Sequence, residues 1–330
     1  MAQKFSLKNA EQVRLSQTAL SQQRIKTFYE DLAKEVAREI KKRGKKDITQ
    51  SQLILLQRDI KTRLKEINED IQSGIVDSMK TTANAVVVDT RTFLKQCGFR
   101  EEDTLNAFLY VPDNVIQNIV NGNVYQEGWS LSQAIWGYTH NFNQKLTEIV
   151  GKGAQSYKSA YEIAKDLEQY VNPTEAKESR RIVSWRKARQ TDVDAGRAKV
   201  VGEKIKDSYY MGRVDYNAQR LARTMISHAY QQSFVMVNEK DPFVTGYRWV
   251  TSNFHGRVCE ICRERADTDK FGLGVGVFPK DQLPLDHPNG MCTFEAVIPD
   301  SMTSIAEKIG KWYEAPTGTY PDIDEYSMQF

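Results

Sequence analysis

The sequence has little of several residue types, and each shortage excludes something. Its 330 residues include only four cysteines and nine prolines. Four cysteines in so long a chain do not form the disulfide framework of a small secreted protein, so a close cysteine pair indicates a metal or redox site instead. The longest apolar run lies around residues 85–88 and the first residues show none, so we expect neither a membrane anchor nor a signal peptide. The net charge of only +3 does not by itself favour nucleic-acid binding.

The residues that are present favour long amphipathic helices. Hydrophobic residues make up 40% and charged residues 27% of the chain, which is polar for one large globule. We therefore expect a mostly α fold, with an N-terminal helical hairpin and a small C-terminal α+β Cys/His module. The expected segments are a hairpin or coiled-coil arm (1–100), a helical region (101–240), the module (241–300) and a tail (301–330).

Two stripes of apolar residues predict the hairpin. They recur at steps of three and four, as in a coiled coil, at Ile25, Phe28, Leu32, Val36 and Ile40, and at Leu53, Leu56, Ile60, Leu64, Ile67, Ile71 and Ile75. Thr49 followed by Gln52 predicts a capping box at the start of the second helix.

Further helices and strands follow from periodicity and stop signals. Helices are expected at about 77–97, 112–122, 130–150, 156–170, 215–238 and 306–312, and strands at 247–250 and 293–298. The tail after about residue 313 is polar, which predicts either disorder or a docking peptide.

Two basic segments are candidate contacts for DNA or for an acidic partner. They comprise Lys41, Lys42, Arg43, Lys45 and Lys46 between the hairpin helices, and Arg180, Arg181, Arg186 and Lys187 around Trp185. Contacts to a phosphate backbone would be independent of sequence and sensitive to salt. The alternative is a solvated turn and an exposed, charged helix pair, in which acidic neighbours such as Glu175 and Glu178 dilute the positive field.

The chemistry of the chain is concentrated in one C-x-x-C pair and a later H-x4-C pair. Cys259, Cys262, His287 and Cys292 supply three sulfurs and one imidazole, which complete a tetrahedron around structural zinc. A metal cross-link would fix the glycine-rich loop between the pairs, so we expect Cys259→Ser to unfold residues 247–298. The alternatives are that His255 replaces His287 as the fourth ligand, or that the thiols are simply reduced.

Other histidines and enzyme motifs give weaker signals. His140 and His228 are expected to be ordinary helical residues. A zinc deaminase would need His-x-Glu before its cysteine pair, and His255 is followed by Gly256 and Arg257. The Asp286-His287 dipeptide resembles the start of an HNH-type nuclease motif, but no later histidine follows it. We therefore expect no enzyme, with a zinc-containing DNA-binding or HNH-like nuclease as the alternative.

An ordered set of short motifs resembles a known family. In chain order the motifs are Gly128-Trp129-Ser130, Ile135-Trp136, 163–167, 218–224 with Ala229-Tyr230, 247–250, 259–262, Phe278-Pro279, Pro284-Leu285, His287-Pro288-Asn289 and Cys292. The set is similar to the head morphogenesis domain of phage minor head proteins related to the F protein of phage Mu, over about residues 125–298. The family commonly has His-Pro-Asn-Cys-Arg-Cys, where this chain has Gly290 and Met291 in place of the first Cys and the Arg.

The resemblance implies a minor capsid protein without catalytic activity. Its expected partners are the portal protein, the capsid and scaffold proteins, and the packaged DNA, with which some relatives are ejected. It also implies an oligomeric arrangement in the virion, at the portal or the head interior, and residence in the host cytoplasm during assembly.

Overall fold

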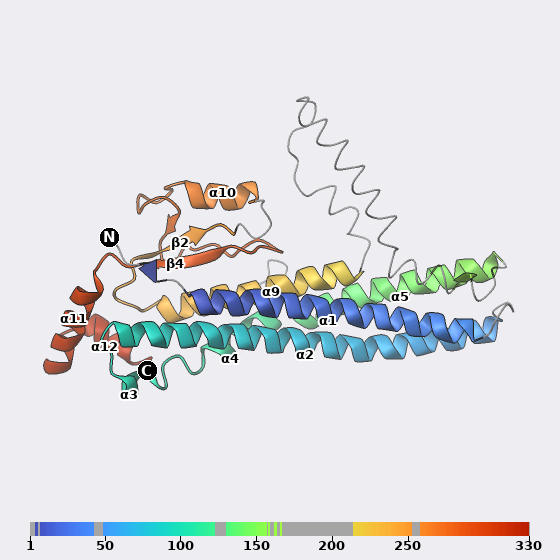
Figure 1. Cartoon of the computed structure of the whole chain (residues 1–330), viewed down its shortest axis with the longest axis horizontal. Coiled ribbons are helices and arrows are strands. Elements are labelled where there is room, and N and C mark those ends of the chain that lie inside the picture. The colour runs from blue at the N-terminus through green and yellow to red at the C-terminus, as the bar shows by residue number, and fades with distance from the viewer. Residues whose placement is uncertain are drawn as a thin grey trace, which may run out of the picture. The chain divides into compact units, whose positions relative to one another are not determined.

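The structure is a computed structural model, and it describes residues 4–5, 7–42, 49–122, 130–156, 158, 162–163, 166, 214–252 and 258–329. It confirms the expected fold class: most described residues are helical, and three C-terminal strands form one small sheet with a short N-terminal strand (Figure 1). The chain groups into two compact units, one of Met1–Ser21, Ser73–Leu131 and Arg220–Phe330, and one of Gln22–Gln72 and Ser132–Gln219. The division into four consecutive segments stays a prediction.

The N-terminal hairpin is present as α1 (Lys8–Lys41) and α2 (Gln50–Gln96). Most of both predicted apolar stripes is buried, including Ile25, Leu32, Val36 and Ile40, and Leu56, Ile60, Leu64, Ile71 and Ile75. The capping box is confirmed, because Thr49 N donates to Gln52 Oε1 over 3.2 Å and Gln52 N donates to Thr49 Oγ1 over 3.4 Å.

The prediction of a separate third helix at 77–97 is wrong. Helix α2 continues without a break for 47 residues. Gly74 lies inside it with nothing within 4 Å of an added Cβ, so this glycine interrupts neither the packing nor the helix. A short α3 (Glu101–Thr104) and α4 (Val111–Val120) follow, and Pro112 lies in the first turn of α4, where proline is tolerated.

Two more long helices come before the first of the C-terminal strands. They are α5 (Leu131–Gln155), which runs past the predicted stop at Gly151, and α9 (Val214–Asn238), which matches its prediction. The helix predicted at 156–170 falls almost entirely outside the described residues, as do Arg43, Lys45, Lys46, Arg180, Arg181, Arg186, Lys187 and His255. Lys41 and Lys42 are exposed at the end of α1, and Lys42 Nζ pairs with Glu39 over 2.6 Å.

The sheet has four antiparallel strands in the order β1-β4-β2-β3. The strands are β1 (Lys4–Phe5), β2 (Gly246–Val250), β3 (Val277–Phe278) and β4 (Thr293–Val297). Alternation in β2 and β4 buries Tyr247, Trp249 and Phe294. The ring of Phe234, on α9, lies 5.2 Å from Tyr247 and 6.1 Å from Phe294, so the sheet packs on this helix.

The C-terminal tail is folded, which corrects the expectation of a disordered or docking peptide. After α10 (Glu260–Asp267), the chain ends in α11 (Met302–Glu314) and α12 (Pro321–Ser327). Ile323 and Tyr326 are fully buried, and Trp312 Nε1 donates to Asp324 Oδ1 over 2.8 Å. Tyr326 also packs on Phe99, with ring centroids 6.3 Å apart.

Among the described helices, none combines the length and the apolar content needed to cross a lipid bilayer.

Candidate metal centre

The first half of the candidate site lies at the start of α10. Cys259 is the N-cap residue, and its sulfur accepts a hydrogen bond from Cys262 N over 3.3 Å. The bond holds the Cys259 sulfur at the free N–H groups of the first turn of α10. Cys262 is buried one turn further along. The C-x-x-C spacing therefore directs both sulfurs to one place.

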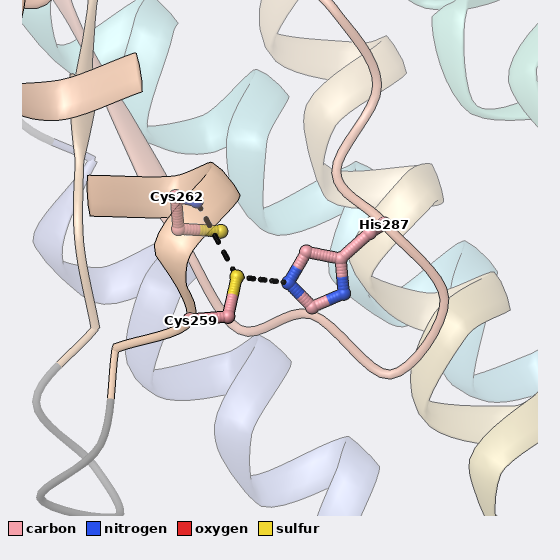
Figure 2. A group of neighbouring side chains, drawn as sticks. All are labelled: Cys259, Cys262 and His287. Carbon is pink, nitrogen blue, oxygen red and sulfur yellow. Dashed lines mark hydrogen bonds between the residues drawn. The ribbon is translucent and has the colours of Figure 1, made fainter. Parts of the chain in front are cut away.

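The second half comes from the loop between β3 and β4. His287 Nε2 lies 3.2 Å from Cys259 Sγ, and the three side chains converge (Figure 2). The ligand atoms of Cys259, Cys262 and His287 all lie within 4.8 Å of one another. Bonds of about 2.3 Å to sulfur and about 2.0 Å to nitrogen place such ligands roughly 3.5 Å apart around zinc, so the spacing fits one ion.

Cys292 belongs to a second, overlapping group. Its sulfur, the sulfur of Cys262 and a carboxylate oxygen of Asp286 also lie within 4.8 Å of one another, and all three residues are buried. The structure thus brings together all four predicted ligands, arranged as two triads that share Cys262. It adds Asp286, which the sequence analysis considered only in comparison with a nuclease motif.

The two buried thiols share a proton unequally. The hydrogen bond with Cys262 lowers the pKa of Cys292 to about 7. The same bond, together with burial, raises the pKa of Cys262 well above its ordinary value. One of the two sulfurs can therefore carry a negative charge near neutral pH. The thiolate is the form of cysteine that binds metal.

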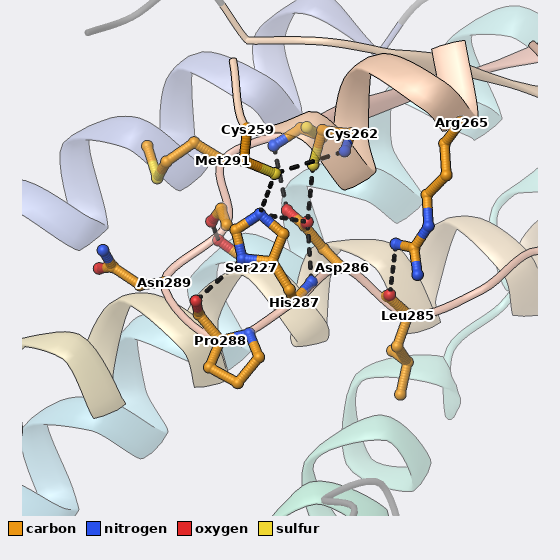
Figure 3. A network of polar contacts seen from close by, with 12 residues as sticks. Ser227, Cys259, Cys262, Arg265, Leu285, Asp286, His287, Pro288, Asn289 and Met291 are labelled. Atoms are coloured by element: carbon orange, nitrogen blue, oxygen red, sulfur yellow. Dashed lines mark hydrogen bonds and ion pairs between the residues drawn. The ribbon is translucent and has the colours of Figure 1, made fainter. Parts of the chain in front are cut away.

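Residues 284–292 are called the ligand loop below, and the carboxylate of Asp286 closes this loop by hydrogen bonds. Oδ1 accepts from His287 N over 2.9 Å and Oδ2 from Cys292 N over 3.1 Å (Figure 3). A Cβ added at Gly290 would lie 2.2 Å from the carboxylate carbon, so only glycine leaves room for this arrangement. The carboxylate and the glycine are therefore a matched pair.

One polar face of α9 holds the same loop by its backbone. Thr224, Ser227, His228 and Gln231 are all buried, and their spacing of three, four and seven residues places them on one side of the helix. Thr224 Oγ1 accepts from Asn289 N over 2.8 Å, and Ser227 Oγ donates to Gly290 O over 3.2 Å. These bonds from α9 therefore hold the loop in its conformation without a metal.

The same face of α9 also binds both the main-chain N–H and the main-chain carbonyl of Asp286. Gln231 Oε1 accepts from Asp286 N over 2.9 Å, and His228 Nε2 lies 3.0 Å from Asp286 O. Burial lowers the pKa of His228, so its ring is neutral and Nε2–H donates this bond. His228 was expected to be an ordinary helical residue, and it is instead a support of the ligand loop.

Two arginines, one half-buried and one fully buried, reach the loop from other elements. Arg265, on α10, donates to Leu285 O over 3.0 Å and stacks on Trp249 at 4.6 Å. Arg14, on α1, is fully buried and donates to Met291 O over 3.2 Å. Both guanidinium groups therefore hold main-chain carbonyl groups of this loop in place.

The donors can hold a metal ion. Three thiols and one imidazole are residue types that bind metal ions such as zinc. Comparisons of the chain with protein-family models, with curated proteins and with solved structures find no significant match.

Proposed function

We propose that this chain is a minor head protein of a tailed phage, with a structural and assembly role at the portal or the head interior. The proposal rests on the ordered set of motifs that resembles the head morphogenesis domain. One observation gives it particular support: the matched motifs are contact partners. The hydroxyl of Thr224, which ends the first α9 motif, binds the main chain of Asn289 in the His-Pro-Asn motif.

The proposed partners are the portal protein and the capsid and scaffold proteins, with packaged DNA as a further one. The protein would be an oligomeric virion component, present in the host cytoplasm during assembly and ejected with the DNA in some systems. The proposed role is not enzymatic.

Purified virions from the phage or induced prophage that encodes the chain test this proposal. Peptides of the chain should co-purify with intact particles, and deletion of its gene should lower the yield of infectious particles while leaving DNA replication unchanged. Particles that lack the chain and remain fully infectious after the deletion would contradict the proposal.

We also propose that Cys259, Cys262, His287 and Cys292 hold one structural zinc ion. When bound, the ion would cross-link α10 to the ligand loop. Elemental analysis of the purified chain should find about one zinc per chain, and Cys259→Ser should remove it.

Cys97→Ser is the matched control for the metal measurement. Cys97 is buried at 1% exposure and is not part of either triad, so its substitution should leave the zinc content unchanged. A chain purified without any metal, and unable to bind zinc in titration, would contradict the metal part of the proposal.

The alternative is a zinc-containing DNA-binding or HNH-like nuclease protein. In such a nuclease the histidine of the Asp-His pair activates a water molecule, whereas His287 Nε2 lies 3.2 Å from Cys259 Sγ, among the metal donors. Metal-dependent DNA cleavage that is abolished by His287→Ala would favour the nuclease over the structural role.

A further inference from the structure

The carboxylate of Asp286 faces the metal donors as well as its own loop. Oδ1 lies 3.9 Å from Cys262 Sγ and 3.9 Å from His287 Nε2. These separations are close to the roughly 3.5 Å expected between two ligands on a tetrahedral zinc ion. Asp286 is therefore placed as a donor and not only as a neighbour.

The hydrogen bonds of Asp286 leave donor capacity on the carboxylate. Each oxygen has two lone pairs, and each accepts one backbone N–H, from His287 or Cys292. Oδ1 also accepts a long contact from the Cys262 thiol over 3.9 Å, and a metal bound to that sulfur in place of its proton would leave this lone pair of Oδ1 available without loss of the bonds that close the loop. Because α9 holds the backbone of Asp286 at both N and O, the carboxylate keeps this position.

Electrostatics also favours a cation at this point. The Asp286 side chain is only 2% exposed and lies beside the thiols of Cys262 and Cys292. The two nearby guanidinium groups, of Arg14 and Arg265, donate to the carbonyls of Met291 and Leu285. A buried carboxylate beside thiolates is costly unless a positive ion lies between them.

We propose that Asp286 is a reserve ligand of the metal ion, able to take the fourth coordination position when His287 leaves it. The inference rests on the proposed metal site. The ion would be held by the three cysteines and by either the imidazole or the carboxylate. Such a mixed sulfur, nitrogen and oxygen set suits zinc and cobalt(II), and does not suit magnesium or calcium.

The two triads give a geometric reason for the exchange. Cys262 belongs to both, with Cys259 and His287 in one and Cys292 and Asp286 in the other. A small displacement of the ion toward Asp286 would exchange nitrogen for oxygen while the three cysteines stay bound. His287 is the more accessible of the two residues, with 31% of its side chain exposed, so it is the ligand able to swing away.

A double-mutant cycle on the full-length protein tests the proposal. Zinc affinity is measured by competition with a chromophoric chelator, and cobalt(II) absorption reports the ligands, for wild type, His287→Ala, Asp286→Asn and the double variant. With a reserve ligand, Asp286→Asn lowers zinc affinity at least about tenfold more in the His287→Ala background than in wild type. His287→Ala alone should still bind one tetrahedral cobalt ion, with shifted bands.

The outcomes separate the possible roles. Equal losses in both backgrounds would mean that Asp286 only positions the loop. Identical cobalt spectra for His287→Ala and the double variant would mean that water, and not Asp286, fills the fourth position. Either result overturns the inference, whereas absence of metal from the wild-type protein would instead contradict the proposed metal site.

Gly290→Ala provides a second variant that keeps the carboxylate. Its added Cβ would collide with the Asp286 side chain at 2.2 Å and displace it. In the His287→Ala background it should therefore weaken zinc binding as Asp286→Asn does, and circular dichroism of each apo protein checks that the helices remain folded. Wild-type-like zinc affinity of Gly290→Ala in that background would contradict a ligand role for the carboxylate.

Discussion

Arg14 Nη2 donates to the carbonyl oxygen of Met291 over 3.2 Å, across a sequence separation of 277 residues. The same guanidinium donates from Nη1 to Ser227 Oγ over 3.3 Å and lies 5.2 Å from the ring centroid of Tyr230. Helix α1 is thereby joined to α9 and to the residue that precedes Cys292. A single buried charge links the first helix of the chain to the candidate metal centre.

Arg14→Met should therefore weaken both the fold and the metal site. Hydrogen bonds to a charged group contribute about 1.5–3 kcal/mol each, so loss of these two bonds should lower the free energy of unfolding by roughly 3–6 kcal/mol. Arg14→Lys keeps the charge but not the several N–H donors of the guanidinium, so its stability should lie between those of wild type and Arg14→Met. Urea unfolding and zinc competition measure the effects, and an unchanged zinc affinity in Arg14→Met would contradict the link to the site.

Removal of the metal should loosen α10 and not the whole module. The sequence alone predicted unfolding of 247–298 on loss of a ligand, but Tyr247 and Phe294 pack on Phe234 of α9 without help from a metal. Hydrogen exchange after chelation should therefore increase over 258–276 and stay low in β2 and β4. Fast exchange throughout both strands would restore the earlier expectation.

Gly290→Ala in the otherwise wild-type chain should be destabilising, because its Cβ would overlap the Asp286 carboxylate. Overpacking of this kind costs about 1–3 kcal/mol. Gly310→Ala is the control: this glycine is exposed in α11 with nothing within 4 Å, so alanine should stabilise by about 0.5–1 kcal/mol. Thermal unfolding of both variants checks the sign, and a neutral Gly290→Ala would mean that the carboxylate moves at little cost.

The stability of the chain should contain a contribution from Asp241 that decreases as pH rises. Burial raises the pKa of Asp241 from 3.8 to about 6. A raised folded-state pKa means that the contribution is fully present below about pH 4 and is lost as pH rises to about 6. A shift of two pKa units corresponds to roughly 3 kcal/mol.

Asp241→Asn provides the measurement, since protonation of His228 and of the thiols affects both proteins alike. The stability of wild type minus that of Asp241→Asn should fall between pH 4 and pH 6 in urea unfolding and then stay level. A difference that rises with pH would show that the carboxylate is stabilised in its charged form, for example by the nearby Lys280, whose Nζ donates to the main-chain oxygen of Asp241.

The sequence predicted the features that depend on local patterns. Three such features are the apolar stripes of α1 and α2, the Thr49–Gln52 capping box and the Cys259–Cys262 pair. Each depends on residues that lie close together in the sequence. Periodicity alone is enough for the first, and side-chain chemistry at fixed spacing is enough for the other two.

The missed features depend on contacts between distant segments. Ser227, His228 and Gln231 form a polar face that in sequence is typical of solvent exposure, and they are buried only because residues 284–290 return to cover them. Arg14 gives no sequence signal for the same reason. In the tail, Ile323 and Tyr326 stand among acidic residues, so the sequence shows no apolar pattern there. Both are buried in the folded chain. A polar stripe at helical spacing opposite an apolar one was the available signal for α9.

The pairing of β1 with β4 sets an order of events for a chain emerging from the ribosome. Lys4 lies opposite Val297 and Phe5 opposite Ala296, so neither residue pair of this ladder can form until synthesis has reached residues 296–297. At 5–20 residues per second, the N-terminal strand waits roughly 15–60 s for its partner. Cys292 leaves the ribosome at nearly the same moment, so closure of this sheet edge and completion of the candidate metal centre both wait for the same short stretch of chain.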